Sequence, residues 1–405
     1  MVTAAISSAP VQAADAGHWL TAWATAQQPV GQQPDMPAFN RAPNLAGQTV
    51  RQILAPRVAG DAWRVRVSNR YGRTPLTIDA ASLAPAGRGA ALAGPAQAVR
   101  FGGAPSVTLA PGASRDSDPV AVHLDVGPAA FSLHLAAGAP TPGDWHKVAS
   151  QVSYVSNDGD HVQDASGGAF HSGPTSWLFV DALLVHATDD ARTAVAIGDS
   201  ITDGMRSSLN ANRRWPDALA RRLAADPATA RVAVVNLGIS GNRLLNDSSC
   251  YGEKLAGRYQ HDALDLPGSR YVIALIGIND INFPAMPKRR GVDCDEPHTF
   301  VSAADLEAGY RRLIDAAHRA HRLIYGATLT PADLPADREA IRTAVNQWIR
   351  TSGAFDAVID FDQALRNPGR PQVLIARYDS GDHIHPSDAG YQAMAEAIPV
   401  KLFTR

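Results

Sequence analysis

The sequence predicts two domains of different fold class: an all-β sandwich of the jelly-roll type, followed by a three-layer α/β domain with a parallel five-stranded sheet. The chain has 405 residues, which exceeds one average domain. Residues 17–188 show hydrophobic alternation with period two, whereas residues 189–405 alternate short apolar runs with helical patterns. Residues 1–16 are predicted to be a leader that belongs to neither domain.

Alternating side chains predict the strands of the first domain. In residues 63–68 and 131–135 apolar side chains alternate with polar ones, which is typical of strands with one buried and one solvated face. Turn-forming residues such as Pro111-Gly112 separate these runs. Some aromatic residues of this domain could form an exposed carbohydrate-binding face or pack against the core or the second domain. These are Trp19, Trp23, Trp145 and Trp177.

The second domain shows strands and helices in alternation, which indicates βαβ units and a parallel sheet. Strands are expected near residues 193–197, 231–236, 271–276, 322–328 and 356–360. Helices are expected over residues 215–225, from the capping box Ser302-Ala303-Ala304-Asp305 onward, and over 337–351 and 388–398. Five parallel strands with covering helices predict a flavodoxin-like domain.

A serine stands where the first of these strands ends. The apolar run stops at Gly198-Asp199-Ser200, and glycine allows the sharp turn that places Ser200 at the carboxyl end of the strand. Ligands bind at this edge in open α/β sheets, so Ser200 is a candidate nucleophile. A turn or helix cap is the alternative role for such a serine.

A candidate base lies near the C-terminus. Asp382 precedes His385 by three residues, so its carboxylate can bond one ring nitrogen while the other faces the nucleophile. His383 competes for the role of base, and Asp379 competes as its partner. The spacing favours the pair Asp382 and His385.

Candidate oxyanion donors follow two further strands. Gly241 and Asn279 lie in loops after apolar runs, on the same predicted edge as Ser200, and backbone N–H groups and side-chain amides suit a developing oxyanion. Gly238 competes with Gly241 as the glycine of the first loop. Asp199 and Asp280 are interpreted as structural residues that cap backbone N–H groups.

These blocks resemble the GDSL-type, or SGNH, hydrolases, and the resemblance covers roughly residues 190–405. The blocks appear in the family's order, with Ile201 where leucine is usual: Gly198-Asp199-Ser200, Gly241, Asn279 and Asp382 with His385. The resemblance implies a carboxylic ester hydrolase with Ser200 as nucleophile, His385 as base and Asp382 as its partner. It implies an oxyanion hole formed by the N–H groups of Ser200 and Gly241 and the amide of Asn279.

The layout of a β-domain before an SGNH domain is similar to secreted carbohydrate esterases of the xylan-esterase-associated branch. It implies removal of short acyl groups, such as acetyl, from a small ester or an acylated polysaccharide. An acyltransferase on glycans would need the same residues. A lipase or phospholipase and a non-catalytic glycan-binding protein are further alternatives.

Composition and motifs argue against several other classes. A net charge of −2 and a charged fraction of 19% speak against nucleic-acid binding. No apolar run is long enough to span a membrane. Metal-binding spacings, nucleotide-binding loops and the Gly-x-Ser-x-Gly motif are absent from the sequence, so we expect no metal, no cofactor and no α/β-hydrolase fold.

The leader and the cysteines suggest an exported protein, secreted or periplasmic. Val11-Gln12-Ala13 matches the small-x-small pattern of a signal-peptidase site, which we interpret as a signal-peptide remnant. The chain has two cysteines, Cys250 and Cys294, each in a polar loop that follows a candidate oxyanion donor. We expect a disulfide between them, and two free thiols are the alternative.

Overall fold

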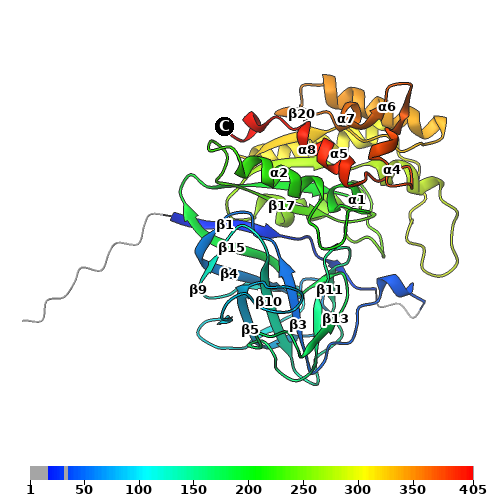
Figure 1. Ribbon diagram of the computed structural model, residues 1–405. Coiled ribbons are helices and arrows are strands. Elements are labelled where there is room, and N and C mark those ends of the chain that lie inside the picture. The colour runs from blue at the N-terminus through cyan, green and yellow to red at the C-terminus, as the bar shows by residue number, and fades with distance from the viewer. Residues whose placement is uncertain (1–16, 32–34, 405) are drawn as a thin grey trace, which may run out of the picture.

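The computed structural model describes residues 17–31 and 35–404 (Figure 1). The predicted leader lies outside these residues. In Figure 1 the antiparallel strands occupy the lower half of the molecule, and the parallel sheet with its helices occupies the upper half. Among the described residues, no helix has the length and apolar character needed to cross a membrane.

The second half of the chain folds around a parallel sheet of five strands with the order β17-β16-β18-β19-β20. The strands are β16 (Arg192–Gly198), β17 (Val232–Gly238), β18 (Ser269–Leu275), β19 (Leu323–Ala327) and β20 (Ala357–Ile359). Numbered within the sheet this order is 2-1-3-4-5, the flavodoxin-like order, whose switch point lies between β16 and β18. The predicted fold class is therefore confirmed, and the five expected strands are all present.

Helices cover this sheet and share one apolar core with it. The long helices are α2 (Trp215–Ala224), α5 (Ala303–Arg319), α6 (Ala336–Thr351) and α8 (Asp388–Glu396). The predicted capping box of α5 is present, because Ser302 and Asp305 bond each other's backbone N–H groups. The sequence analysis did not predict the short helices α1 (Ser200–Asp203), α3 (Leu255–Tyr259), α4 (Ile278–Asn282) and α7 (Phe361–Leu365), nor the hairpin of β21 (Arg366–Asn367) and β22 (Arg370–Leu374).

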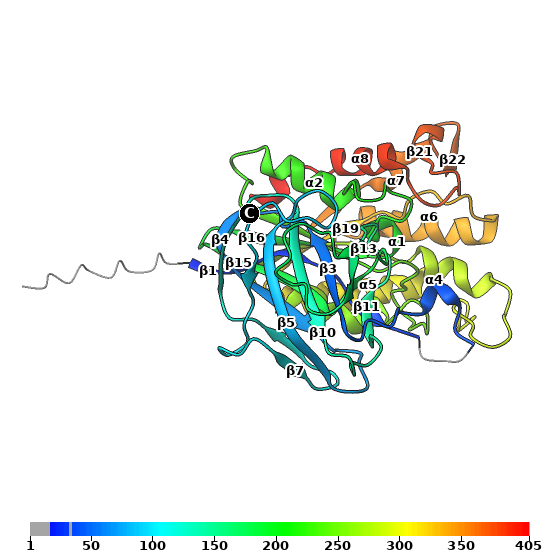
Figure 2. The same cartoon turned by 60° about the horizontal axis from the view of Figure 1, so that its bottom comes forward.

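The first half of the chain forms antiparallel sheets, and two larger ones enclose a common core. One contains β1 (Gly17–Ala24), β15 (Val180–Thr188), β4 (Gly60–Ser68), β8 (Ser114–Asp116) and β9 (Val120–Leu124). The other contains β13 (Phe170–Ser172), β12 (Tyr154–Asp158), β3 (Gln48–Leu54), β10 (Ala129–Leu135), β5 (Leu76–Pro85), β6 (Gln97–Ala98) and β7 (Val107–Leu109), and β3, β5 and β10 run side by side in Figure 2. A third sheet of three short strands comprises β14 (Trp177–Leu178), β11 (Asp144–His146) and β2 (Gln28–Pro29).

The polar face of these strands is less exposed than the alternation predicted. Ser68 and Ser132, expected in contact with solvent, are buried. The Ser132 hydroxyl accepts a hydrogen bond of 2.8 Å from the Arg51 guanidinium, which is itself buried and also donates to the Ala90 carbonyl. Loops therefore cover this face of the sheet, and its polar groups satisfy one another.

The candidate aromatic face is not present on the β-sandwich. Trp23, Trp145 and Trp177 are buried in its core. Trp19 is half-buried against the core of the second domain, and the Arg64 guanidinium lies 4.3 Å from its ring centre. The interpretation of these tryptophans as residues that pack in the core or against the second domain is confirmed. The alternative, that they form an exposed carbohydrate-binding face, is wrong.

The two halves are packed directly against each other. β1 contacts β17, and the Thr21 hydroxyl donates to the Pro267 carbonyl at 2.9 Å. The Thr193 hydroxyl of β16 in turn donates to the Thr21 carbonyl at 2.9 Å. Ala182 and Leu184 of β15 belong to the core of the parallel sheet rather than to that of the sandwich. The sandwich is therefore fixed beside β16, the strand that leads to Ser200.

Candidate active site

The turn that presents Ser200 depends on Gly198 and Asp199. A Cβ atom at Gly198 would lie 2.1 Å from the carbonyl oxygen of Leu275, so a larger residue does not fit. Asp199 is the N-cap of α1, and its carboxylate accepts the N–H of Ile201 at 3.0 Å. Burial raises the pKa of Asp199 to about 7. The capping role expected for Asp199 is confirmed.

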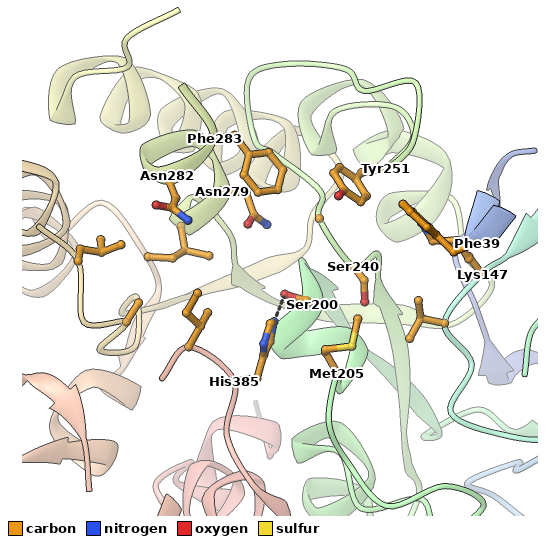
Figure 3. Close-up of a pocket in the computed structure, with 16 residues that line it drawn as sticks. Phe39, Lys147, Ser200, Met205, Ser240, Tyr251, Asn279, Asn282, Phe283 and His385 are labelled. Carbon is orange, nitrogen blue, oxygen red and sulfur yellow. Dashed lines mark hydrogen bonds between the residues drawn. The ribbon is translucent and has the colours of Figure 1, made fainter. Parts of the chain in front are cut away.

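Ser200, His385 and Asp382 form a continuous chain of hydrogen bonds. His385 Nε2 lies 2.8 Å from Ser200 Oγ, and His385 Nδ1 lies 2.8 Å from Asp382 Oδ2 (Figure 3 shows the first of these contacts). Burial disfavours the ionised form of Asp382. The carboxylate accepts hydrogen bonds from the His385 backbone N–H, the His385 ring and the Ile384 N–H. These bonds outweigh the effect of burial and hold the pKa of this carboxyl well below its usual range. An ionised Asp382 favours the imidazole tautomer with the proton on Nδ1.

The competing residues form a separate pair. His383 is exposed, and its Nδ1 lies 2.6 Å from Asp379 Oδ2. Asp379 also accepts the backbone N–H groups of Gly381 and His383. The structure therefore places His385 rather than His383 against Ser200.

The candidate oxyanion donors meet Ser200 at one cavity. Gly241 has φ +82°, and a Cβ atom there would lie 2.3 Å from the Tyr251 ring. The Asn279 amide donates one hydrogen bond of 3.0 Å to the Asn242 carbonyl, which fixes its orientation and leaves its second N–H for another acceptor. Gly238 instead lies against the backbone of Asp203.

Asp280 holds the loop that follows Gly241. Its two carboxylate oxygens accept the N–H groups of Leu244 and Leu245 at 2.8 and 3.0 Å. Burial raises the pKa of Asp280 to about 6. The structural role predicted for this residue is confirmed.

The cavity has a volume of about 510 Å³ and mostly apolar walls. Its lining comprises Phe39, Lys147, Val148, Ser200, Met205, Ser240, Gly241, Tyr251, Ile278, Asn279, Asn282, Phe283, Ala332, Leu334, Ile384 and His385. Figure 3 shows Ser200 and His385 between one wall that contains Asn279 and Phe283 and another that contains Phe39 and Lys147. A volume of this size suits a small organic ligand.

The β-sandwich half contributes part of the cavity lining, and this contribution was not predicted from the sequence. Phe39, Lys147 and Val148 precede Ser200 by at least fifty residues and reach the cavity only because the two halves pack together. No local motif marks these residues, so sequence patterns give little reason to select them.

A buried network also joins the sandwich to the helix that begins at Ser200. His146 of β11 contacts the Ala26 carbonyl through Nδ1 and Asp203 of α1 through Nε2, each at 2.9 Å. Asp203 accepts the backbone N–H and the hydroxyl of Ser240 at 2.9 and 2.6 Å. The sandwich thereby helps to hold both α1 and the loop that carries Gly241.

Cys250 and Cys294 form the expected disulfide, with their Cα atoms 5.1 Å apart. The bond connects the loop that carries Tyr251 to the loop before α5, and Met36 packs against it. Because Tyr251 lines the cavity, the disulfide also fixes part of its wall.

We expect the double substitution Cys250→Ser, Cys294→Ser to reduce the free energy of unfolding by about 2–4 kcal/mol, since the disulfide restricts the unfolded chain. Urea unfolding of the double variant beside the oxidised wild type measures this difference. Wild type treated with a reductant serves as a second sample that lacks the bond without any substitution. Equal unfolding midpoints for all three samples would contradict a stabilising role.

Within residues 17–31 and 35–404 there is no cluster of three or more His, Cys, Asp or Glu side chains arranged to hold a metal ion. The polar side-chain groups that line the cavity are three hydroxyls, an imidazole, an amino group and two amides, from Ser200, Ser240, Tyr251, His385, Lys147, Asn279 and Asn282. These groups suit nucleophilic attack and the stabilisation of a negatively charged oxygen.

Comparisons with known proteins give one family match and several similar solved structures. Residues 196–393 match the model of the GDSL-like lipase/acylhydrolase family. No curated protein matches the chain. Among solved structures, the chain is similar to a G-D-S-L family lipolytic protein from Desulfitobacterium hafniense, with 19% identity and a TM-score of 0.38 over 51% of this chain and 96% of that one.

Two further solved structures cover a comparable part of the chain. An α/β hydrolase enzyme from the metagenome of Lake Arreo, Spain, is 22% identical with a TM-score of 0.40, over 53% of this chain and 98% of that one. An acetylxylan esterase from Geobacillus stearothermophilus is 22% identical with a TM-score of 0.37, over 51% of this chain and 91% of that one.

Proposed function

We propose that this carboxylic ester hydrolase, whose residues 196–393 match the GDSL-like lipase/acylhydrolase family, removes short acyl groups, above all acetyl, from carbohydrate esters through a Ser200–His385–Asp382 triad. The observation that carries the proposal is the chain of two 2.8 Å hydrogen bonds from Ser200 through His385 to Asp382. A serine, an imidazole and a carboxylate in this order have the arrangement of a serine hydrolase triad.

The proposed reaction proceeds through an acyl-enzyme. His385 Nε2 takes the proton of Ser200 Oγ as this oxygen attacks the ester carbonyl carbon, and a tetrahedral intermediate with a negatively charged oxygen forms. The intermediate collapses with cleavage of the bond to the alcohol oxygen, which receives the proton from His385. Water then attacks the acyl-enzyme by the same steps, releasing the carboxylic acid and restoring Ser200.

Three donors are proposed to stabilise the charged oxygen: the N–H groups of Ser200 and Gly241 and the side-chain amide of Asn279. The bond from Asn279 to the Asn242 carbonyl orients this amide before substrate binds, so that little reorganisation is needed during the reaction. The positive φ at Gly241 belongs to the same fixed loop geometry.

We expect Asn279→Ala to lower kcat by about 10²–10³-fold with a small change in KM, because the lost donor acts on charge that develops in the transition state. Steady-state kinetics with 4-nitrophenyl acetate measure both constants. Asn282→Ala removes the other amide that lines the cavity and is expected to alter KM more than kcat. A rise in KM alone for Asn279→Ala would contradict its oxyanion role.

The lining of the cavity supports a carbohydrate ester. Phe39, Tyr251 and Phe283 offer aromatic surface to the C–H faces of a sugar ring, while amide and hydroxyl groups lie beside Ser200. The order of a β-sandwich followed by the hydrolase domain also resembles carbohydrate esterases, as the sequence analysis found.

Hydrolysis of 4-nitrophenyl esters from acetyl to palmitoyl tests the acyl preference, and acetylated polysaccharides test the alcohol component. Highest kcat/KM for the shortest chains and release of acetate from a polysaccharide would support the proposal. Preference for long chains would favour a lipase-like esterase. Transfer of the acyl group to an added sugar, at the expense of free acid, would identify an acyltransferase.

We further propose that the protein acts outside the cytoplasm, in the periplasm or in the medium. The disulfide between Cys250 and Cys294 supports this location, because such bonds persist mainly in oxidising compartments. Fractionation of the native cells with an antibody against the protein tests the proposal, and recovery only in the cytoplasmic fraction would refute it.

A further inference from the structure

Lys147 brings an amino group from the β-sandwich half into the proposed active-site cavity (Figure 3). Its Nζ donates hydrogen bonds to Asn40 Oδ1 at 2.6 Å and to the Cys250 carbonyl at 3.2 Å. An ammonium group carries three N–H donors, so these two contacts leave one donor for a ligand.

The surroundings of this amino group are unusual for a lysine. Nζ lies 5.1 Å from the ring centres of both Phe39 and Tyr251, and the residue is half-buried. Across the described residues, no carboxylate forms an ion pair with Lys147. A cation removed from water in an apolar cavity is costly unless an opposite charge meets it.

The carboxylate that acts on the pKa of Lys147 is that of Asp203 in α1, which raises it. Both oxygens of that carboxylate are engaged, one by His146 and the other by Ser240. The other titratable side chains that line the cavity are the Tyr251 phenol and the His385 imidazole. Neither supplies a permanent negative charge, and the Asp382 carboxylate behind His385 is already paired with that ring and with Arg206. An anionic ligand would therefore be the direct partner of Lys147.

We propose that Lys147 forms an anion subsite of the active-site cavity and that the preferred substrates are esters which also carry a carboxylate. This inference rests on the proposed function, because it requires an ester bound at Ser200. The two neutral acceptors hold the ammonium group in place, and the aromatic rings beside it reduce competition from water. The carboxylate would accept the remaining N–H of Lys147 in a charge-assisted hydrogen bond.

Matched pairs of esters test the subsite, because the two members of each pair differ only by the replacement of a carboxylate with a neutral carboxamide of similar size. On the alcohol side, 4-acetoxybenzoate is compared with 4-acetoxybenzamide. On the acyl side, mono-4-nitrophenyl glutarate is compared with 4-nitrophenyl 4-carbamoylbutanoate. We expect kcat/KM for the anionic member of at least one pair to exceed that of its amide by about tenfold at pH 6.5, the size of a hydrogen bond to a charged group. A ratio near one in both pairs would overturn the proposal.

The pH dependence of this ratio separates a charge effect from a change in cavity shape. Burial lowers the pKa of Lys147 to about 8, and Asp203 partly offsets the effect. The ammonium form therefore dominates below this pH, and the neutral amine dominates above it. We expect the preference for the anionic ester to be complete near pH 6.5 and to fall as the pH rises through about 8. A titration that affects both members of a pair equally cancels in the ratio.

Substitution then assigns the effect to one side chain. Lys147→Gln is expected to bring the ratio close to one and to remove its pH dependence. Lys401→Gln removes a cation from an exposed site far along the chain and should leave the wild-type ratio. If Lys147 only anchored Asn40 and Cys250, Lys147→Gln would lower both rates equally and leave the ratio intact, which would overturn the proposal.

Failure of this inference is distinguishable from failure of the proposed function. Hydrolysis that depends on Ser200 but shows no charge preference would refute the anion subsite alone. Absence of any Ser200-dependent hydrolysis would refute the function on which the inference rests. If Lys147→Gln did not fold, the charge preference of the wild type and its loss above pH 8 would still decide the question.

Discussion

Ser200→Ala is expected to lower kcat for ester hydrolysis by about 10⁶-fold, the scale observed when the nucleophile of a serine hydrolase is removed. The Ser200 hydroxyl supplies the bond to the acyl group, and among the described residues no other hydroxyl forms a hydrogen bond with His385 Nε2. Substrate binding should change much less, because the cavity walls remain in place. Kinetics with 4-nitrophenyl acetate measure the effect, supported by mass spectrometry of any acyl-enzyme trapped at early times.

Ser114→Ala provides the control for this substitution. Ser114 is an exposed residue of strand β8 and does not line the cavity, so its loss should leave kcat at the wild-type value. Circular dichroism of both variants shows whether the fold is retained. Substantial activity in a folded Ser200→Ala protein, or an acyl group attached to another residue, would exclude Ser200 as the nucleophile.

The α/β half of the fold could be predicted from the sequence because each of its elements carries a local pattern. The apolar run that becomes β16 ends at Gly198, and the helix at Ser302 begins with a capping box. Such cues depend on neighbouring residues alone. Strand pairing is not local, yet parallel strands joined by helices permit few arrangements, and the flavodoxin-like order is one of them.

The cavity could be predicted only in part, because its walls come from segments that are distant in sequence. The fold class brings four cavity residues together at the carboxyl edge of one parallel sheet. Three of them follow strands of that sheet, and the fourth precedes its last long helix: Ser200, Gly241, Asn279 and His385. Lys147 reaches the same cavity because β11 packs beside α1 through the contact between His146 and Asp203. Packing between domains of this kind produces no periodic pattern in the sequence of either segment.

The burial of Ser132 illustrates a second limit. Period-two alternation distinguishes the two faces of β10 but does not show whether loops cover the polar face. In the structure Arg51 bonds Ser132 there, and the Ala90 and His161 carbonyls accept from the same guanidinium. A polar side chain thus indicates a hydrogen-bonding environment rather than contact with solvent.

His385→Ala is expected to lower kcat by about as much as loss of Ser200, about 10⁶-fold, since neither residue can act without the other. His385 Nε2 contacts Ser200 Oγ at 2.8 Å, so removal of the ring leaves the hydroxyl proton without its acceptor among the described residues. The carboxylate of Asp382 would also lose its bond to the ring. Comparison of kcat for 4-nitrophenyl acetate at pH 8 measures the loss.

His383→Ala is the matched control, because it removes the same type of side chain two positions earlier. His383 is exposed and bonds Asp379, so its loss breaks one surface ion pair and should change kcat by less than about threefold, the effect of a weak surface interaction. A large loss for His383→Ala with little effect of His385→Ala would reverse the assignment of the base. Equal losses would show instead that the loop of residues 379–386 acts as a unit, with Asp379 and Asp382 both needed to hold His385 against Ser200.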